Sequence, residues 1–201
     1  MLTIHGIPGS RAFRCIWAAE EGGLDYRLNP VTYGADCKTA EFRALNPAGK
    51  IPALTDGDLV LTESLAINLH LAGKAGPPLM PGGASGAHVL QWTLWAATEL
   101  EPPVMRWAYH TVFHPPEQRR PEEAAAGAEA LRRPLALLEQ HLAARDWILP
   151  EGFTLADLNV AAVLQDAWGR GLTYPEFPHV ARWYEASFAR PAARRVLAMR
   201  A

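Results

Sequence analysis

The stretch from Asn46 to Ser64, NPAGKIPALTDGDLVLTES, constrains the fold of this chain more than any other segment. Its Asn-Pro-Ala-Gly start is a dense turn signal, and Pro47 and Pro52 each favour extended geometry in the residue before them. Two short β-prone runs follow, Ala-Leu-Thr and Leu-Val-Leu, and the Asp-Gly pair between them favours a tight hairpin turn. The segment therefore predicts a two-stranded antiparallel unit.

A helix is predicted to begin directly after the second of these strands. Thr62-Glu63-Ser64 precedes the run from Leu65 to Ala72, which has helical composition and is apolar on most sides. The first N–H groups of a helix lack intrahelical partners and carry the positive end of its dipole, so they favour a carboxylate. Ser64 can add a hydroxyl donor and Glu63 can accept from an ammonium group, so the pair could hold the head of an amino acid. The alternative is that Thr62 and Ser64 only cap the helix.

Two motifs in this region resemble the glutathione-binding half of the cytosolic glutathione S-transferase family. The first, NPxGxIPxL, begins at Asn46, and the second, LTESxAI, begins at Leu61. Both match in order and at the spacing of the family. Together with features of the second half, the resemblance covers essentially the whole chain. We expect a bacterial, serine-type-like member whose subclass the sequence leaves open.

The resemblance also implies roles for individual residues. Pro52 would be the cis-proline of the family, and the backbone of Ile51 would pair with the cysteinyl part of glutathione. Glu63 and Ser64 would hold the γ-glutamyl end, and Lys50 would lie near the tripeptide. These five residues form the predicted glutathione site.

The elements predicted before the linker follow the order of a thioredoxin-like domain. Residues 2–7 have β character, 11–22 are helical, and 26–31 form a second strand. Because a helix joins these two strands, they are most simply parallel, with a right-handed crossover. A short helix over 38–45 is expected before the turn. Periodicity alone does not name this fold, but the resemblance assigns residues 1–75 to an α/β thioredoxin-like, glutathione-binding domain.

A linker rich in glycine and proline is predicted over residues 76–85. Almost no β-like alternation follows it, so we predict an all-α domain over residues 86–201. The resemblance implies that this domain contributes the hydrophobic substrate pocket. Within it, the pair Pro102-Pro103 is expected to end or kink the helix that carries Trp92 and Trp95.

A helix-start signature lies between Phe153 and Leu158. Thr154 can bond the backbone N–H of Asp157, Asp157 can reach back to Thr154, and Phe153 can pack on Leu158 as a hydrophobic staple. A capping box of this kind also begins a central helix in the family. We therefore give Thr154 and Asp157 a structural role.

The composition excludes several classes of protein. A net charge of −2 over 201 residues gives no electrostatic footprint for nucleic acid, and no apolar run is long enough to span a bilayer. The N-terminus lacks the basic region of a signal peptide. Two lone cysteines fit a reducing compartment, and seven scattered histidines show no metal-binding spacing. We predict a cytoplasmic protein with no metal, no cofactor, no membrane contact and glutathione as its co-substrate.

Ser10 is the candidate for stabilising the reactive sulfur. Glutathione chemistry needs the thiolate, and an ordinary thiol has a pKa near ~8.5. A hydroxyl that donates to the sulfur contributes roughly 1.5–3 kcal/mol and a helix N-terminus about 0.3–1, which together lower that pKa by about one to three units. Ser10 lies between the first strand and the first helix, where the family keeps its catalytic Ser, Tyr or Cys. An ordinary N-cap is its alternative role, and Arg11 or nearby backbone N–H groups could hold the thiolate instead.

Four residues after the double proline lie where the family lines its pocket for the electrophile. They are Arg106, Trp107, Tyr109 and His110. Arg106 or His110 could polarise an acceptor group. An aromatic helix face is, however, more often core than pocket, so both readings stay open.

The function that these observations predict is attack of the glutathione thiolate on a hydrophobic electrophile. The resemblance implies a detoxifying glutathione transferase that forms a homodimer, with glutathione-dependent peroxidase activity as an additional option. One alternative is an isomerase of the maleylacetoacetate type, although the Ser-Ser-Cys-Ser run of that branch is missing. Another is a non-catalytic, transferase-like protein that binds ligands or partner proteins.

Overall fold

The computed structural model describes residues 1–200, which form two compact units. The first unit contains Met1–Gly82 together with the chain from Ala189 onward, and the second contains Gly83–Phe188. The division falls inside the predicted 76–85 linker. The C-terminal helix belongs to the first unit rather than to the helical domain predicted over 86–201. Across residues 1–200, every helix is too short or too polar to cross a membrane.

Within the described residues, the first unit is built on a mixed four-stranded sheet in the order β2-β1-β3-β4. Strand β1 (Leu2–His5) pairs in parallel with β2 (Arg27–Asn29). Helix α1 (Ala12–Glu21) connects them, so the predicted parallel pair is confirmed. The α1 face that packs in the unit is apolar apart from one arginine, Arg14.

The predicted hairpin is present as β3 (Ala53–Asp56) and β4 (Leu59–Thr62). Gly57 makes the turn with a φ of 61°, a conformation that glycine adopts without steric cost. Strand β3 also pairs antiparallel with β1, so it is central and β4 is an edge strand.

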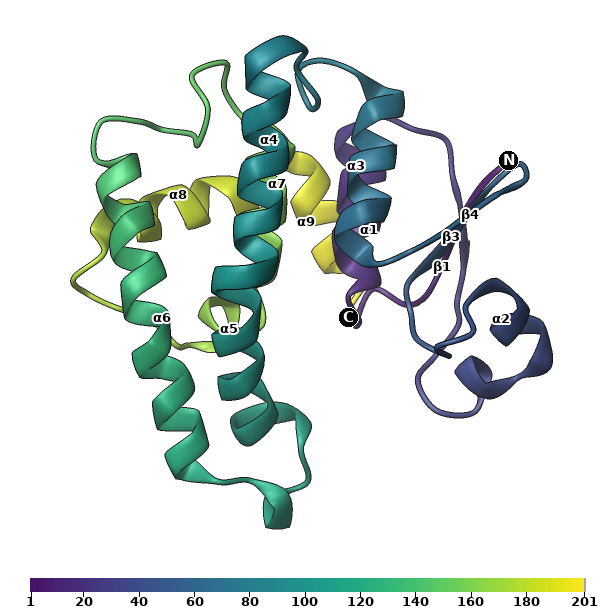
Figure 1. The fold of residues 1–201 in the computed structure, drawn as a ribbon, viewed down its shortest axis with the longest axis horizontal. Helices are drawn as coiled ribbons and strands as arrows, with labels where there is room; N and C mark the ends of the chain where they lie inside the picture. The colour runs from purple at the N-terminus through teal and green to yellow at the C-terminus, as the bar shows by residue number, and fades with distance from the viewer. Residues whose placement is uncertain (201) are drawn as a thin grey trace. The chain divides into compact units, whose positions relative to one another are not determined.

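Helices cover both faces of this sheet. Figure 1 shows α1 and α3 (Ser64–Ala75) together on one side and α2 (Ala40–Leu45) on the other, where a short 3-10 turn, η1 (Asp36–Lys38), precedes α2. The core between the sheet and the two long helices consists of fully buried apolar side chains, among them Ile4, Ile16, Trp17, Leu54, Ile67 and Leu71.

Helix α9 (Pro191–Ala198) joins the first unit through α1. The Nε of Arg190 donates to Oε1 of Glu21 at 2.9 Å, and the Nε of Arg195 donates to Oε2 of Glu20 at 2.7 Å. These ion pairs link positions at opposite ends of the sequence. Together with the buried apolar face of α9 (Ala192, Ala193 and Val196), they place the last helix with the first unit.

The second unit begins with a long helical run that passes through the double proline. Helix α4 (Gly83–Trp95) leads into a π-helical turn, η2 (Ala96–Leu100), and then into α5 (Glu101–Ala108). Pro102 and Pro103 have no N–H to donate to the preceding turn, and their rings crowd its carbonyls. The wider π turn accommodates this loss, so the expected helix end or kink appears as a local change of helix type.

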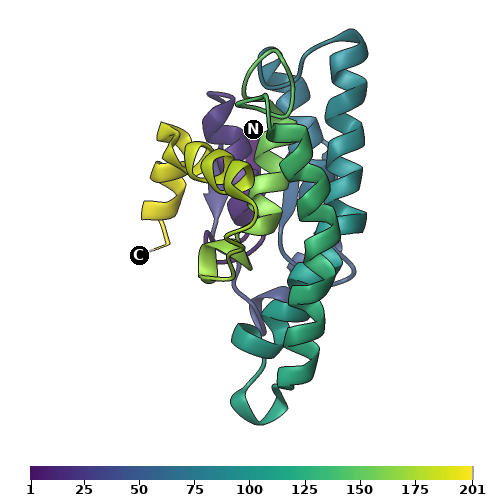
Figure 2. The ribbon, with the colours of Figure 1, turned by 90° about the vertical axis from the view of Figure 1, so that its left-hand side faces the viewer.

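Helix α6 (Pro121–Leu142) runs alongside α5, as Figure 2 shows. A second π turn, η3 (Tyr109–Phe113), and a 3-10 turn, η4 (Pro116–Gln118), connect the two helices. Gly127 of α6 lies against the α5 backbone, where an added Cβ would be 2.6 Å from the backbone nitrogen of Trp107. Only glycine allows this approach.

The centre of the second unit is α7 (Leu155–Leu164), every residue of which is buried. The predicted capping box is present at its start: Asp157 Oδ2 accepts from the backbone N–H of Thr154 at 2.9 Å. Asp157 Oδ1 also accepts from the N–H of Ile148 at 2.8 Å and from the indole N–H of Trp183 at 2.9 Å. Burial raises the pKa of Asp157 to about 6, and the hydrogen bonds oppose that shift.

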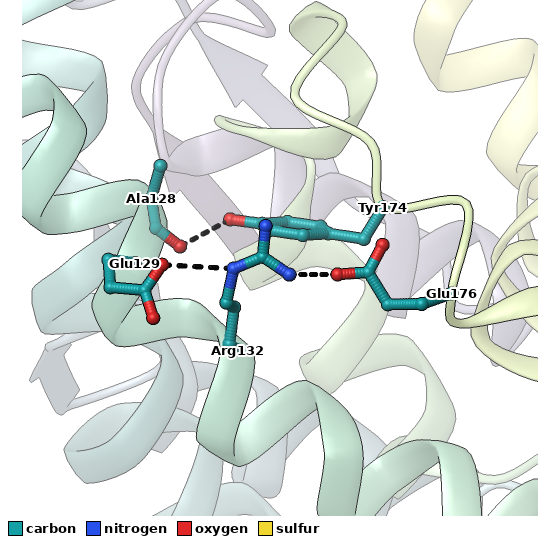
Figure 3. Close-up of polar contacts among 5 residues, drawn as sticks. All are labelled: Ala128, Glu129, Arg132, Tyr174 and Glu176. Carbon is teal, nitrogen blue, oxygen red and sulfur yellow. Dashed lines mark hydrogen bonds and ion pairs between the residues drawn. The ribbon is translucent and has the colours of Figure 1, made fainter.

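The remaining elements of the second unit are the 3-10 turn η5 (Trp168–Arg170) and helix α8 (Pro178–Ala189). Arg132 of α6 fixes the segment between them, as Figure 3 shows. Its guanidinium carbon lies 5.3 Å from the ring centroid of Tyr174, and its nitrogens pair with Glu129 and Glu176. The Tyr174 hydroxyl donates to the carbonyl of Ala128 at 2.6 Å. Burial raises the pKa of Tyr174 to about 12.

Candidate functional site

The sheet register brings the predicted glutathione residues to one end of the first unit. Ala53 pairs with His5 on one side and with Thr62 on the other. The loop after β1, the turn before β3 and the start of α3 therefore all leave the sheet at this end. The loop of Ser10, the turn of Pro52 and the Glu63-Ser64 pair thus lie at the same end of the sheet.

Gly6, directly after β1, allows this convergence. Its φ is 151°, and an added Cβ would lie 2.7 Å from the Cβ of Ala12 and 3.5 Å from that of Ile51. A side chain at this position would push the start of α1 away from the turn before β3. The glycine therefore keeps the loop that carries Ser10 close to the segment that carries Pro52.

The turn before β3 is held by Asn46. Its Nδ2 donates to the carbonyl of Lys50 at 2.6 Å, and its Oδ1 accepts from the N–H of Ala48 at 3.1 Å. The peptide bond between Ile51 and Pro52 is cis, the geometry that the resemblance implies. Both residues are buried, whereas Lys50 is exposed. The charge of Lys50 is therefore available to a ligand at this turn.

Glu63 and Ser64 occupy the junction between β4 and α3. Ser64 is the first residue of the helix and is buried, whereas the Glu63 side chain is exposed. Glu63 has a φ of 64°, which is unusual for a residue with a side chain, and strained residues of this kind cluster at functional sites. The junction thus presents a carboxylate, a hydroxyl and the free N–H groups of a helix start within two residues.

Two residues of α1 hold Ser64, and neither was predicted to belong to the site. The guanidinium Nη1 of Arg14 donates to Ser64 Oγ at 3.3 Å, and Arg14 is only 2% exposed. The thiol of Cys15 donates to the Ser64 carbonyl at 3.5 Å. Burial raises the pKa of the Cys15 thiol, so this side chain stays protonated within the packed core. The one signal for Arg14 in the sequence is a charged residue on the otherwise apolar face of the first helix.

Ser10 is buried in the loop between β1 and α1. Its hydroxyl donates to the carbonyl of Ile7 at 2.7 Å and accepts from the N–H of Ala12 at 3.1 Å. The second contact satisfies a free donor in the first turn of α1, which is the capping role considered as the alternative. Arg11 lies next to it and is exposed. Rotation of the Ser10 hydroxyl away from Ile7 would free its proton for a ligand.

His5 ends β1 close to these segments and is buried. Its Nδ1 lies 3.0 Å from the Asn29 amide nitrogen and its Nε2 lies 3.2 Å from Thr55 Oγ1. Burial lowers the pKa of His5, and the neighbouring charge of Arg27 adds to the effect. The ring therefore stays neutral and bridges three strands. Among residues 1–200, no group of three or more His, Cys, Asp or Glu side chains is placed to hold a metal ion.

The four predicted pocket residues of the second unit each make a different contact. Arg106 Nε pairs with Glu123 Oε2 of α6 at 2.7 Å, which raises the pKa of Arg106 and lowers that of Glu123. His110 Nδ1 accepts from the backbone N–H at position 120, also at the start of α6. The backbone of Trp107 packs against the glycine of α6. Tyr109 is exposed and stacks on His114, with 5.0 Å between the ring centroids.

Sequence comparison decides the family. Residues 1–73 match the family described as glutathione S-transferase, N-terminal domain, and residues 121–186 match glutathione S-transferase, C-terminal domain. Glutathione S-transferase 3 of Zea mays is 36% identical over 208 residues, which cover 98% of this chain and 93% of the maize protein. The chain belongs to the glutathione S-transferase family.

Solved structures of glutathione S-transferases share the fold over almost the whole chain. The theta class glutathione S-transferase of Xanthomonas axonopodis pv. citri, solved with glutathione bound, has a TM-score of 0.87. It is 32% identical, and the match covers 96% of this chain and 95% of the Xanthomonas chain. The predicted fold, a thioredoxin-like domain followed by a helical domain, is confirmed, and so is the enzyme class, glutathione transferase.

A second kind of relative carries the same fold within a longer protein. Elongation factor 1-gamma 2 of Oryza sativa subsp. japonica is 34% identical over 203 residues. The match covers 98% of this chain and 48% of the rice protein, so this chain spans about half of that relative. Glutathione S-transferase folds therefore occur both in proteins named as transferases and in a protein named as an elongation factor.

Proposed function

We propose that this glutathione S-transferase conjugates the thiolate of bound glutathione to small hydrophobic electrophiles. The observation that carries the proposal is the junction of β4 and α3, where buried Ser64 begins a helix directly after Glu63. This junction lies at the same end of the sheet as the cis-proline turn and the loop of Ser10. The Xanthomonas relative with bound glutathione supports the choice of ligand.

In the proposed complex, the γ-glutamyl end of glutathione binds at this junction. Its carboxylate accepts from the Ser64 hydroxyl and from the first N–H groups of α3, because these donors and the helix dipole favour an anion. The exposed carboxylate of Glu63 accepts from the ammonium group. The backbone of Ile51 pairs with the cysteinyl residue, which the cis-Pro52 turn presents, and Lys50 adds a positive charge near the tripeptide.

Ser10 stabilises the thiolate in this proposal. Its hydroxyl must leave the Ile7 carbonyl, which costs about 0.5–1.5 kcal/mol for a neutral hydrogen bond. The hydrogen bond to the sulfur anion is charge-assisted and contributes roughly 1.5–3 kcal/mol. The exchange is therefore favourable on balance, and the N–H of Ala12 can keep its contact with the oxygen. Arg11, which is exposed beside Ser10, is the alternative thiolate partner.

The electrophile is assigned to Arg106, Trp107, Tyr109 and His110 of the second unit. Three are aromatic or heteroaromatic and partly accessible, which suits a hydrophobic acceptor, and Arg106 can polarise it. We further propose a cytoplasmic, detoxifying homodimer of the serine type, related to the bacterial members of the family.

The test is an assay of the conjugation of glutathione to chlorodinitrobenzene, in which the absorbance of the product measures the rate. Turnover that needs both substrates supports the proposal. Turnover absent with this and other electrophiles, together with no retention on a glutathione matrix, would overturn it. Oxidised glutathione that accumulates with an organic hydroperoxide would show that the same thiolate also reduces peroxides.

A non-catalytic binding protein is the second candidate. Two observations favour it: the likeness to an elongation factor 1-gamma protein, and the Ser10 hydroxyl that is held by Ile7 and Ala12. This candidate predicts that the protein binds glutathione without lowering the pKa of its thiol. An ultraviolet titration of the thiolate in the complex separates the two candidates.

A further inference from the structure

Arg14 is a buried positive charge directly beside the predicted glutathione site. Its side chain is 2% exposed, and its neighbours on α1, Phe13, Ile16 and Trp17, form the apolar core. A charge taken out of water in this way is costly unless polar groups surround it. One of those groups is Ser64 Oγ, 3.3 Å from Nη1. The fold therefore keeps a guanidinium at a costly position, where it contacts the first residue of α3.

The contact fixes which way the Ser64 hydroxyl can donate. A guanidinium is a donor only, so Ser64 Oγ accepts from Arg14 and must point its own proton elsewhere. A hydroxyl that accepts from a charged donor is also polarised and becomes a stronger donor itself. Cys15 meanwhile holds the Ser64 carbonyl. Ser64 is thus oriented from its side chain and from its backbone by consecutive residues of α1.

Arg14 also adds charge at the N-terminus of α3. The dipole of a helix is equivalent to roughly half a positive charge at this end, whereas a guanidinium carries a full one. Because Arg14 is buried, water and salt screen its field less than that of a surface arginine. An anion that binds at the α3 start would therefore interact both with the helix dipole and with the charge of Arg14.

We propose that Arg14 is a positioning residue for the carboxylate of the γ-glutamyl group, acting through the Ser64 hydroxyl and through its own charge. This inference rests on the proposed function, since it assigns the ligand group that the α3 start receives. Arg14 itself does not touch the ligand. Its role is to make Ser64 an oriented donor in a positive field.

The experiment compares two ligands by calorimetric titration. Glutathione carries the carboxylate in question, and 4-aminobutyryl-cysteinyl-glycine lacks it but keeps the amine, the thiol and the glycine carboxylate. We expect Arg14→Met to weaken glutathione binding by about five- to tenfold, an effect of about 1 kcal/mol through one hydrogen bond. Binding of the analogue should change less than about twofold. Arg14→Lys, which keeps the charge, should bind glutathione with intermediate affinity.

Two controls separate this role from a purely structural one. Arg194→Met removes an exposed arginine of α9 and should leave both affinities unchanged. In a Ser64→Ala background, Arg14→Met should weaken glutathione binding by a smaller factor than in the wild type, because the route through the Ser64 hydroxyl is already lost. If Arg14→Met does not fold, Arg14→Lys takes its place in this cycle.

The outcomes distinguish failure of this inference from failure of the proposed function. Equal losses for glutathione and for the analogue would show that Arg14 only maintains the fold, and would overturn the inference. Unchanged glutathione affinity in a folded Arg14→Met protein would overturn it as well. A wild type that binds neither ligand would overturn the proposed function itself.

Discussion

Ser10 forms two hydrogen bonds, and a bound thiolate would compete for one of them. The hydroxyl donates to Ile7 and accepts from Ala12, so only its donor contact must change. We predict that Ser10→Ala lowers kcat by about ten- to hundredfold and raises the pKa of bound glutathione by about one to two units, since the lost charge-assisted bond contributes roughly 1.5–3 kcal/mol. Stopped-flow turnover and an ultraviolet thiolate titration measure the two effects.

Ser10→Thr is the matched control because it keeps a hydroxyl at the same position. It should retain most of the rate and the lowered thiol pKa. Unchanged rate and unchanged thiol pKa in Ser10→Ala would remove Ser10 from catalysis and leave Arg11 or the backbone as the thiolate partner.

His5 makes the stability of the first unit depend on pH. Its ordinary pKa is 6.5, and burial lowers the pKa in the folded protein. Below the ordinary value the unfolded chain takes up a proton while the folded chain does not, so stability is present above that pH and is lost as the pH falls towards the lowered value. We predict that urea unfolding shows this loss as the pH falls below 6.5, the ordinary pKa of the ring.

The variant His5→Gln removes the titrating group and keeps hydrogen-bonding capacity toward Asn29 and Thr55. This variant should be less stable than the wild type at neutral pH, but its free energy of unfolding should depend less on pH in this range. A profile with the same slope in His5→Gln would assign the acid sensitivity to other groups.

At the level of whole elements, the contact of α5 with α6 depends on Gly127. An alanine Cβ there would lie 2.6 Å from the Trp107 nitrogen and 3.0 Å from the Pro103 carbonyl oxygen, which are backbone atoms and cannot rotate away. We predict that Gly127→Ala destabilises the protein by about 1–3 kcal/mol, although alanine favours a helix by up to ~1 kcal/mol. Thermal unfolding followed by circular dichroism measures the change.

Gly73 of α3 provides the matched control. It is exposed, and an added Cβ would meet no atom within 4 Å. Gly73→Ala should therefore leave stability unchanged or raise it by up to ~1 kcal/mol. If Gly127→Ala were equally harmless, α5 and α6 would not be held at the distance described.

The elements that the sequence predicts well are those with local signals. The Asp-Gly turn fixes the β3 and β4 hairpin, the helix between β1 and β2 implies their parallel pairing, and Thr154 with Asp157 marks the start of α7. The π turns around α5 were not predicted, because a double proline indicates a disturbed helix without specifying how the helix adapts.

The parts of the site that were missed depend on contacts between distant positions. Arg14 and Ser64 are 50 residues apart, and no periodicity links a charged residue on α1 to the start of α3. Arg190 and Glu21 are 169 residues apart, so the placement of α9 with the first unit is equally hidden from local patterns. The Glu63-Ser64 pair can be predicted because its signal is local: the carboxylate, the hydroxyl and the helix start are contributed by consecutive residues.

At the scale of the whole molecule, the predicted homodimer can be tested at two exposed leucines of α4. Leu90 is 45% exposed and Leu94 is 57% exposed, one helical turn apart. We predict that the wild type elutes with twice the mass of one chain and that Leu94→Glu dissociates it, because a buried carboxylate without a partner is costly. Light scattering after size exclusion measures both masses.

Leu137 of α6 is the control position, since it is 50% exposed on a different helix. Leu137→Glu should leave the mass unchanged. A wild type that elutes as a single chain at every concentration would contradict the predicted homodimer without affecting the proposed glutathione site.

A crystal structure of the complex with glutathione would show whether the start of α3 receives the γ-glutamyl end of the tripeptide. We predict that the glutamyl carboxylate lies within hydrogen-bonding distance of Ser64 Oγ and of the first N–H groups of α3, that the ammonium group lies at Glu63, and that the sulfur faces Ser10. Glutathione bound at another place, or this junction empty at a saturating concentration of glutathione, would contradict it.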